Sequence, residues 1–356
     1  MPNLLVTGGA GFIGANFVHY WLARHPGDNL VVLDALTYAG NPANIESALP
    51  NPRFTFVRGD IATPGLAAAL LRDHRINALV HFAAESHVDR SIAGPDPFLE
   101  TNVLGTHVLL KAARQVWLDE GGGGGEAVRF HHISTDEVYG SLGPDDPPST
   151  EESPYRPNSP YAASKAASDH LARAYHRTYG LPVTITNCSN NYGRFQFPEK
   201  LIPLMLVQAL KGGPLPVYGD GLHVRDWLHV EDHCVALERV LAQGRMGETY
   251  NIGGGNQWTN IDVVRLLAGL LDQAFAVDRG LARRFPRCPA SRGVPTASLI
   301  THGPDRPGHD RRYAVCSRKA ESDLGFRPAH RFEIGLREMV AWYLDHEEWW
   351  RPVVSF

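Results

Sequence analysis

The strongest constraint on the fold is a glycine-rich turn near the start of the chain, between an apolar run and a helix-like stretch. Residues 4–7 have the character of a short buried strand, residues 8–14 supply the turn, and residues 15–24 have the character of a helix. Glycines at such a turn let the backbone approach a phosphate group, whose charge meets free N–H groups and the positive end of the helix. The motif therefore predicts a first βαβ unit of an α/β fold.

Apolar runs and helical stretches continue to alternate through the first half of the chain. The expected strands are residues 4–7, 30–34, 54–58, 78–83, 130–134 and 183–187. Near-continuous apolar runs are typical of parallel strands that helices cover on both faces. We therefore predict an α/β protein with a Rossmann-type, doubly wound parallel sheet and a smaller C-terminal α/β substrate-binding domain.

The domain boundaries follow from where this pattern loosens. Prolines become frequent after residue 187, and residues 283–312 are rich in proline and arginine, which indicates loops. We expect the Rossmann domain to span residues 1–187 and to be rejoined by about residues 226–253, where a helix-like and a strand-like stretch return. Residues 188–225 and 254–356 would then form the substrate-binding domain.

The composition argues against several classes of partner. The net charge is −4 without a basic block, so we expect no nucleic-acid partner. No stretch approaches the roughly 18 apolar residues of a membrane span, and no secretion signal is evident, so we expect no membrane partner and a cytoplasmic location. We also expect no metal, because the four cysteines are too scattered for a zinc site or a disulfide framework: Cys188, Cys234, Cys288 and Cys316.

An acidic residue after the second expected strand indicates which nucleotide the glycine turn serves. Asp34 follows Gly14 by about 20 residues, where a carboxylate accepts both ribose hydroxyls of NAD and repels the 2′-phosphate of NADP. A tight structural turn with an exposed aspartate is the alternative. Strand, turn, helix, strand and acid in this order predict an NAD site that includes Gly8, Gly11, Phe12, Ile13, Gly14 and Asp34.

A tyrosine and a lysine four residues apart indicate proton transfer. Tyr161 and Lys165 would share one helix face, so the lysine charge favours the tyrosinate, a general base for an alcohol proton. We expect Ser159 to cap this helix and Pro160 to lie in its first turn, which places Tyr161 near the positive helix end. A surface pair on an amphipathic helix is the alternative.

Thr135, Asp136 and Glu137 follow the expected strand 130–134, at the edge where open α/β sheets bind their ligands. The Thr135 hydroxyl can bond a substrate alcohol beside Tyr161. The two acids could protonate a leaving hydroxyl and remove a carbon-bound proton. On the local sequence alone, a capped helix N-terminus with two acids in its first turn is equally compatible.

These motifs together resemble the extended short-chain dehydrogenase/reductase family, and more narrowly the dTDP-glucose 4,6-dehydratases, over nearly the whole chain. The narrower resemblance rests on residues 135–137, 189–193, 198–203, 224–227 and 305–313. It implies that Tyr161, helped by Lys165 and Thr135, removes the proton of the sugar 4-hydroxyl as NAD⁺ takes a hydride. Glu137 would then take the C5 proton, and Asp136 would protonate the departing 6-hydroxyl. Return of the hydride to C6 and of a proton to C5 gives the 4-keto-6-deoxy sugar, with NAD bound throughout.

The resemblance also implies a homodimer, in which the helices 101–116 and 161–178 pair with their symmetry mates. It further implies which residues bind the ligands. Asp60 and Ile61 could border the adenine, although an aspartate capping a helix that begins near Thr63 is as compatible. The cofactor residues would further include Thr37, Asp60, Ile61, Ala83, Tyr161 and Lys165. The nucleotide-sugar site would include Ser86, Thr135, Asn190, Lys200, Leu201, Pro216, Tyr218, Arg225, Asn260, Arg306 and His309.

Two other functions stay open. A 4,6-dehydratase or 4-epimerase for a CDP-, UDP- or GDP-linked sugar would share most of the motifs, but an epimerase needs no elimination and hence no Asp136–Glu137 pair. A non-catalytic NAD-binding redox sensor would need none of Thr135, Tyr161 and Lys165.

Overall fold

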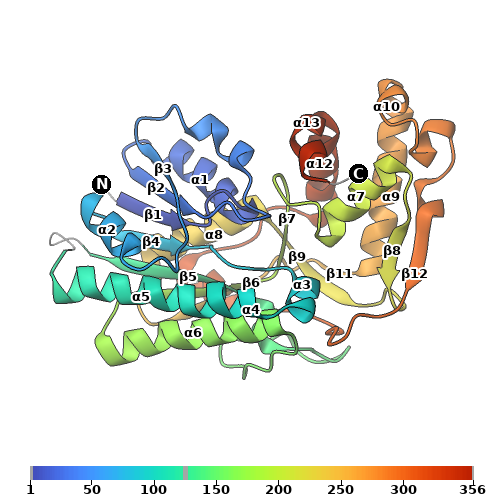
Figure 1. Cartoon of the computed structure of the whole chain (residues 1–356). Coiled ribbons are helices and arrows are strands. Elements are labelled where there is room, and N and C mark those ends of the chain that lie inside the picture. Colours follow the sequence, from blue (N-terminus) through green and yellow to red (C-terminus); the bar gives the residue numbers. More distant parts are fainter. Residues whose placement is uncertain (1–2, 123–126, 355–356) are drawn as a thin grey trace.

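The centre of the computed structural model, which describes residues 3–122 and 127–354, is a seven-stranded parallel sheet (Figure 1). Its strand order is β10-β6-β5-β4-β1-β2-β3, so the order reverses between β1 and β4. In a doubly wound sheet, ligands bind at the carboxyl ends of the strands beside this reversal. The strands are β1 (Asn3–Thr7), β2 (Asn29–Asp34), β3 (Phe54–Arg58), β4 (Ala78–His81), β5 (Arg129–Thr135), β6 (Val183–Cys188) and β10 (Thr249–Ile252).

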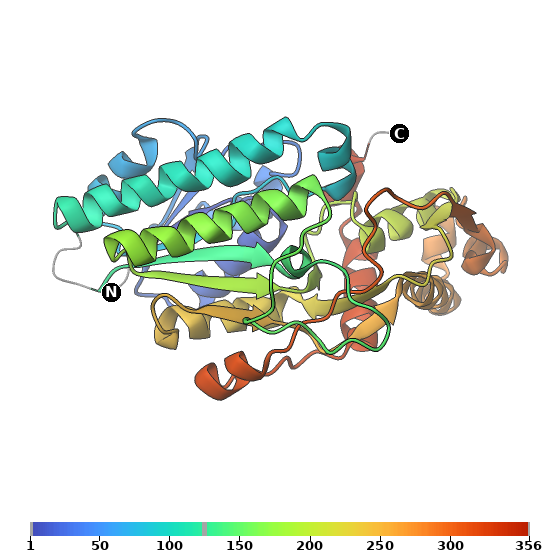
Figure 2. The same ribbon diagram turned by 90° about the horizontal axis from the view of Figure 1, so that it is seen from below.

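Helices cover both faces of this sheet (Figure 2). On one face, α1 (Phe12–Arg24) and α8 (Val230–Gln243) pack on Leu4, Val6 and Val32. On the other face, α2 (Leu66–Asp73), α5 (Thr106–Arg114) and α6 (Pro160–Tyr179) pack on Leu5 and Leu79. Neighbouring strand residues thus enter different apolar cores, as the continuous apolar runs predict. The predicted doubly wound fold is confirmed.

The rest of the chain lies beyond the carboxyl ends of the central strands (Figure 1). It contains two small sheets and a group of helices around one apolar core that includes Trp227, Phe332 and Trp350. The sheets are formed by β7 (Asn190–Tyr192), β9 (Val224–His229) and β11 (Gln257–Thr259), and by β8 (Leu215–Tyr218) and β12 (Ile300–Gly303). The helices are α7 (Leu201–Lys211), α9 (Asn260–Val277), α10 (Gly280–Arg284), α12 (Phe332–Asp345) and α13 (Glu347–Trp350).

Shorter elements complete the described chain. The π-type turns Leu99–Gly105 and Gln115–Asp119 make one continuous helical stretch with α4 (Asp96–Phe98) and α5. None of the helices in the described ranges is both long and apolar enough to cross a membrane. The other short helices are α3 (Val88–Ala93), α11 (Arg318–Leu324) and the 3-10 helices Pro42–Asn44, Glu46–Ala48, Asp136–Tyr139, Pro289–Arg292, Thr296–Leu299 and Arg351–Val353.

The expected strands are all present, and two details differ from the prediction. Strand β4 ends at His81, because the chain then turns so that the Ala83 N–H faces the Thr7 hydroxyl at 3.4 Å. The segment 283–312, predicted as loops, contains β12, which pairs in parallel with β8. That pairing joins residues about 85 positions apart, so no local pattern reveals it. The expected strand Thr249–Ile252 does return to the main sheet, beside β6.

The glycine turn allows a direct test of the packing. A Cβ at Gly14 would lie 2.2 Å from the Gly8 carbonyl oxygen, so we expect Gly14→Ala to lower the free energy of unfolding by about 1–3 kcal/mol. Gly269→Ala is the control, because that position lies in α9 with nothing within 4 Å of the added carbon. Denaturant unfolding followed by circular dichroism should show the loss for position 14 alone; equal stability of both variants would contradict the prediction.

Candidate active site

One cavity of about 530 Å³ lies at the carboxyl ends of the central strands. Every residue predicted from the sequence to bind or react lines this cavity, from Gly8 in the first turn to His309 near the C-terminus. The structure thus brings together the predicted cofactor, catalytic and substrate residues. Their individual roles remain predictions at this point.

The glycine turn fits a dinucleotide pyrophosphate. A Cβ at Gly8 would lie 2.6 Å from the Ala83 nitrogen, and Gly8 has a φ of +73°, so only glycine suits this close approach. Helix α1 follows with Gly11 as its N-cap and no side chain capping it. Its first N–H groups are therefore available to an anion.

Asp34 ends β2 at the rim of the same half of the cavity. Its Oδ2 accepts from the Ala10 N–H (2.9 Å) and its Oδ1 from the Leu36 N–H (2.8 Å). Burial raises the pKa of this carboxyl, and these two bonds oppose the shift. A carboxylate has about four acceptor sites, so capacity remains for ribose hydroxyls. The geometry fits NAD.

Asp60 and Ile61 also line the nucleotide half. The Asp60 Oδ1 accepts from the Ala62 N–H at 2.8 Å, which closes a short turn. Helix α2 begins only at Leu66 with Gly65 as its N-cap, so the alternative in which Asp60 caps a helix that begins near Thr63 does not hold. Gly65 in the left-handed region, with φ +80°, delays the helix start.

Helix α6 begins as predicted, since Ser159 Oγ accepts from the Ala162 N–H at 3.1 Å. Tyr161 and Lys165 are both buried, and the Lys165 Nζ donates to the Ile133 carbonyl at 2.7 Å. Burial lowers the pKa of Lys165 to about 8. Burial and then the charge of Glu137 raise the pKa of Tyr161 well above its usual value. The predicted lowering of the tyrosine pKa is therefore wrong for the protein alone, because burial outweighs the favourable terms.

Thr135 caps a 3-10 helix, Asp136–Tyr139, because its Oγ1 accepts from the Glu137 N–H at 3.3 Å. The capping interpretation is thus right for Thr135. It does not account for Asp136, which is 3% exposed and whose Oδ2 has no hydrogen-bond partner among the described residues. A carboxyl group that served only in the first turn of a helix would be exposed to solvent.

The environments of the two acids push their pKa values apart. Burial, followed by the charges of Glu137 and Asp226, raises the pKa of Asp136 well above its usual value. Burial also raises the pKa of Glu137, but three cations oppose that shift: Arg225, Arg306 and Lys200. Asp136 is therefore suited to hold a proton, and Glu137 to accept one.

Cationic side chains gather in the other half of the cavity. The Lys200 Nζ donates to the Ser86 carbonyl at 2.6 Å, and the Arg306 Nη1 donates to Asp89 Oδ1 at 3.3 Å. The Tyr218 hydroxyl donates to the other oxygen of Asp89 at 3.0 Å. Within the described chain, six buried polar atoms of cavity residues lack a hydrogen-bond partner: Asp136 Oδ2, Asn190 Oδ1, Gln196 Oε1, Trp227 Nε1, Asn260 Oδ1 and Arg306 Nε. Together these groups provide unused donors and acceptors for a polar, anionic ligand.

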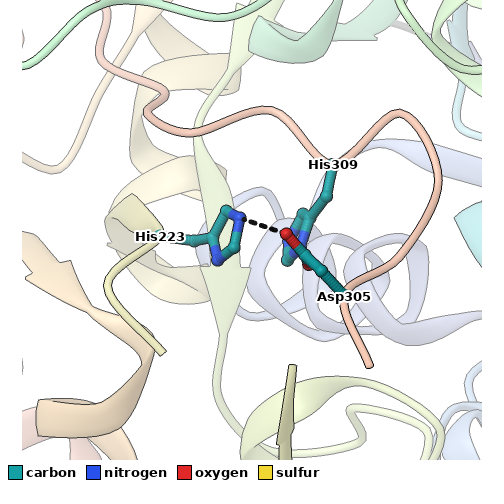
Figure 3. A group of neighbouring side chains, drawn as sticks. All are labelled: His223, Asp305 and His309. Atoms are coloured by element: carbon teal, nitrogen blue, oxygen red, sulfur yellow. Dashed lines mark hydrogen bonds and ion pairs between the residues drawn. The ribbon is translucent and has the colours of Figure 1, made fainter. Parts of the chain in front are cut away.

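His223, Asp305 and His309 form a cluster at the edge of this half (Figure 3). The Asp305 carboxylate lies 2.7 Å from His309 Nδ1 and 3.3 Å from His223 Nε2, and the two rings stack at 3.6 Å. Their ligand atoms are close enough to hold a metal. However, burial and the charges of Arg225 and Arg306 lower the pKa of His309 to about 4. The same positive field disfavours a divalent cation and favours an anion, so we assign no metal.

A second histidine group lies outside the cavity. His229 and His330 stack at 4.0 Å, near Glu338. The His330 Nδ1 lies 2.9 Å from Asp232 Oδ1, and this contact raises the pKa of His330. The contact between His330 and Asp232 accounts for this group without a metal.

Tyr313 is a cavity residue that was not predicted. Its hydroxyl donates to Asp310 and lies 3.4 Å from Glu137 Oε2, and the Arg225 guanidinium lies 4.3 Å above its ring. Arg225 itself donates to two backbone carbonyls, those of Val224 and Asp310. The only signal in the sequence was that residue 313 ends one of the segments that resemble the dehydratases.

Comparison with known proteins agrees with this site. The family model described as GDP-mannose 4,6 dehydratase matches residues 5–339. The dTDP-glucose 4,6-dehydratase of Xanthomonas campestris pv. campestris (strain B100) is 53% identical over 100% of this chain and 97% of its own length. Its counterpart from Escherichia coli (strain K12), dTDP-glucose 4,6-dehydratase 1, is 48% identical over 98% of this chain and 94% of its own.

A solved structure supports the same grouping. DesIV, the dTDP-glucose 4,6-dehydratase of Streptomyces venezuelae crystallised with NAD bound, superposes with a TM-score of 0.85 at 50% sequence identity. The match covers 99% of this chain and all of DesIV. The chain therefore belongs to the nucleotide-sugar 4,6-dehydratases and, within them, to the dTDP-glucose 4,6-dehydratase family.

Proposed function

We propose that the protein converts dTDP-glucose to dTDP-4-keto-6-deoxyglucose and water, as an NAD-dependent hydro-lyase. The observation that carries this proposal is the pair of the buried Asp136 and the half-buried Glu137 in the same cavity as Tyr161 and Lys165. Oxidation alone needs the tyrosine and lysine, whereas elimination needs an additional acid and base. The family relatives are named for this reaction.

The chain's own residues supply the proton transfers. NAD, when bound, takes up a hydride from C4 and gives it back at C6. Tyr161 removes the 4-hydroxyl proton, with the Lys165 charge and the Thr135 hydroxyl beside it. The resulting ketone acidifies the C5 proton, which Glu137 removes. Asp136, held protonated by its burial, donates its proton to the 6-hydroxyl, which leaves as water, and a proton returns to C5 when C6 receives the hydride.

The cationic half of the cavity is the proposed site of the diphosphate. Lys200, Arg225 and Arg306 line it, and guanidinium groups donate paired hydrogen bonds to phosphate oxygens. Asn190 and Asn260 would use their unpartnered oxygens for the nucleotide sugar, and Ser86 would reach the glucosyl group. Leu201, Pro216, Tyr218 and His309 complete the proposed wall.

We further propose a homodimer, a cytoplasmic location and the domain division 1–187 with 226–253 against 188–225 with 254–356. The helical stretch 96–119 leaves Leu99 (51% exposed), Leu104 (57%) and Leu118 (37%) uncovered, which favours an interface there. Leu109 and Ala112 are buried within the protomer, so they would not take part. All four cysteines are free thiols, which favours a reducing compartment.

The cofactor prediction concerns Asp34. NAD should co-purify with the protein and NADP should not, because a 2′-phosphate would meet this carboxylate. Mass analysis of the supernatant after denaturation identifies the nucleotide. Asp34→Asn should lose about 1.5–3 kcal/mol of NAD binding, since a charged acceptor is replaced by a neutral one. Recovery of NADP from the parent protein would overturn the assignment.

The sharpest prediction separates oxidation from elimination. Glu137→Gln keeps Tyr161 and Lys165 but removes the C5 base, so dehydration should slow by ~10²–10⁴-fold while oxidation at C4 continues. Absorbance of the reduced cofactor should then build up in a single turnover with dTDP-glucose.

Tyr161→Phe is the matched control, and it should suppress that signal because the first proton is not removed. Dehydration by Glu137→Gln at the parent rate would show that the acid pair is only a helix start. In that case a 4-epimerase would again be compatible with the motifs.

The dimer prediction is tested at Leu104. Light scattering at micromolar concentration should give twice the 39.2 kDa chain mass. Leu104→Asp should shift the population toward the monomer, because a charge would be buried in the interface. Ile334→Asp, at a position 52% exposed on α12, is the control and should leave the mass unchanged. A monomeric parent protein would sink the proposal.

A further inference from the structure

A carboxylate with no role in the chemistry above is buried one helical turn beyond Lys165. Asp169 lies on α6, and its side chain is 0% exposed. A buried carboxylate is costly unless cations or hydrogen-bond donors compensate it. The contacts of Asp169 therefore indicate what it is for.

Several donors converge on Asp169 from neighbouring segments. Its Oδ2 accepts from Ser134 Oγ at 2.9 Å and from the Tyr155 hydroxyl at 2.8 Å, and Asn187 Nδ2 lies 3.4 Å away. Its Oδ1 lies 3.1 Å from His132 Nε2. Ser134 and His132 belong to β5, which runs alongside α6 (Figure 2) and ends at Thr135. Asp169 thus holds the reactive end of β5 against the helix that carries Tyr161.

The charge of Asp169 acts on Lys165. Burial lowers the pKa of Lys165. Two groups oppose this shift, Asp169 and, more weakly, Cys188 of β6. Two imidazoles also face the lysine, His81 of β4 and His132 of β5. Burial lowers the pKa of both, that of His132 to about 4, so they are neutral at neutral pH. Asp169 is left as the counter-charge of the lysine.

Asp169 itself is ionised. Its burial favours the neutral acid, but His132, Lys165 and Ser134 together hold its pKa below the usual value. The lysine and the aspartate therefore sustain each other's charges in a site that would otherwise neutralise both.

We propose that Asp169 is a positioning residue for the reaction: it keeps Lys165 protonated beside Tyr161 and fixes the end of β5 that presents Thr135. This proposal rests on the proposed function, since Lys165 matters through proton removal by Tyr161. A residue that serves only the packing of α6 would not affect the protonation of Lys165.

The test is the pH dependence of the rate in Asp169→Asn, which removes the charge and nearly preserves the shape. The parent rate should fall at alkaline pH as Lys165 loses its proton. Removal of a neighbouring opposite charge typically shifts a pKa by about 1–3 units, so the alkaline limb should move down by at least about one pH unit. With a parent limb near pH 8 and a shift of one unit, the loss relative to the parent should be about fivefold greater at pH 8 than at pH 6.

Two further variants show whether charge is the cause. Ser134→Ala removes a hydrogen bond to Asp169 but leaves its charge, so its alkaline limb should stay where the parent has it. Lys165→Arg keeps position 165 charged at every accessible pH, so adding Asp169→Asn in that background should cost at least tenfold less than in the parent. A uniform loss at all pH values, or the same cost in both backgrounds, would overturn the proposal.

A stability measurement keeps the proposal testable if Asp169→Asn does not fold. Lys165→Met leaves the buried carboxylate without its counter-charge, so the folded-state pKa of Asp169 should rise above the unfolded value. A carboxyl with a raised folded-state pKa stabilises the folded protein less as the pH rises. The Tm of the variant should therefore fall further below the Tm of the parent as the pH rises from 5 to 7.5. Lys165, whose pKa is lowered to about 8, stays mostly protonated in the parent over this range. A constant Tm difference would contradict the proposal.

The two proposals fail in different ways. Parent protein that does not dehydrate dTDP-glucose would contradict the proposed function. Parent protein that does so, with an alkaline limb that Asp169→Asn leaves unmoved, would contradict only the role of Asp169.

Discussion

The hydrogen bond from Lys165 Nζ to the Ile133 carbonyl, 2.7 Å long, ties helix α6 to strand β5, and the arrangement of the site depends on it. The helix carries Tyr161, and the strand ends in Thr135, followed by the two acids. One buried contact therefore holds the groups for alcohol oxidation in register with those for elimination. Because one element is a strand of the central sheet and the other a helix packed on it, the distance between the two chemistries does not depend on a loop.

Burial then decides how these groups behave. Exclusion of water raises the pKa of Tyr161 and Asp136 and lowers that of Lys165 to about 8, so burial shifts each group toward its neutral form, although the lysine stays charged at neutral pH. Burial also raises the pKa of Glu137, but cations from other parts of the chain oppose this shift. A proton donor and a proton acceptor thus stand side by side in sequence, with environments that differ.

The substrate half of the cavity has a different origin. It is assembled from side chains that lie far apart in the sequence, such as Ser86, Lys200 and Arg306. The contact between Arg306 and Asp89 spans 217 positions, and that between Lys200 and Ser86 spans 114. Such a wall forms only when the C-terminal part folds over the ends of the central strands.

The sequence by itself predicted the sheet, the glycine turn that fits NAD and the Tyr161–Lys165 pair, because these are local patterns: alternating apolar runs, a glycine turn before a helix, and residues four apart on one helix. Only the tertiary structure decided that Asp136 is buried rather than exposed, that Tyr313 and Asp169 lie beside the reactive groups, and that β12 pairs with β8. The expectation that the pKa of Tyr161 is lowered was wrong for the same reason, because burial raises it. Burial and the charge of distant neighbours are properties of the packed chain, and spacing in the sequence does not contain them.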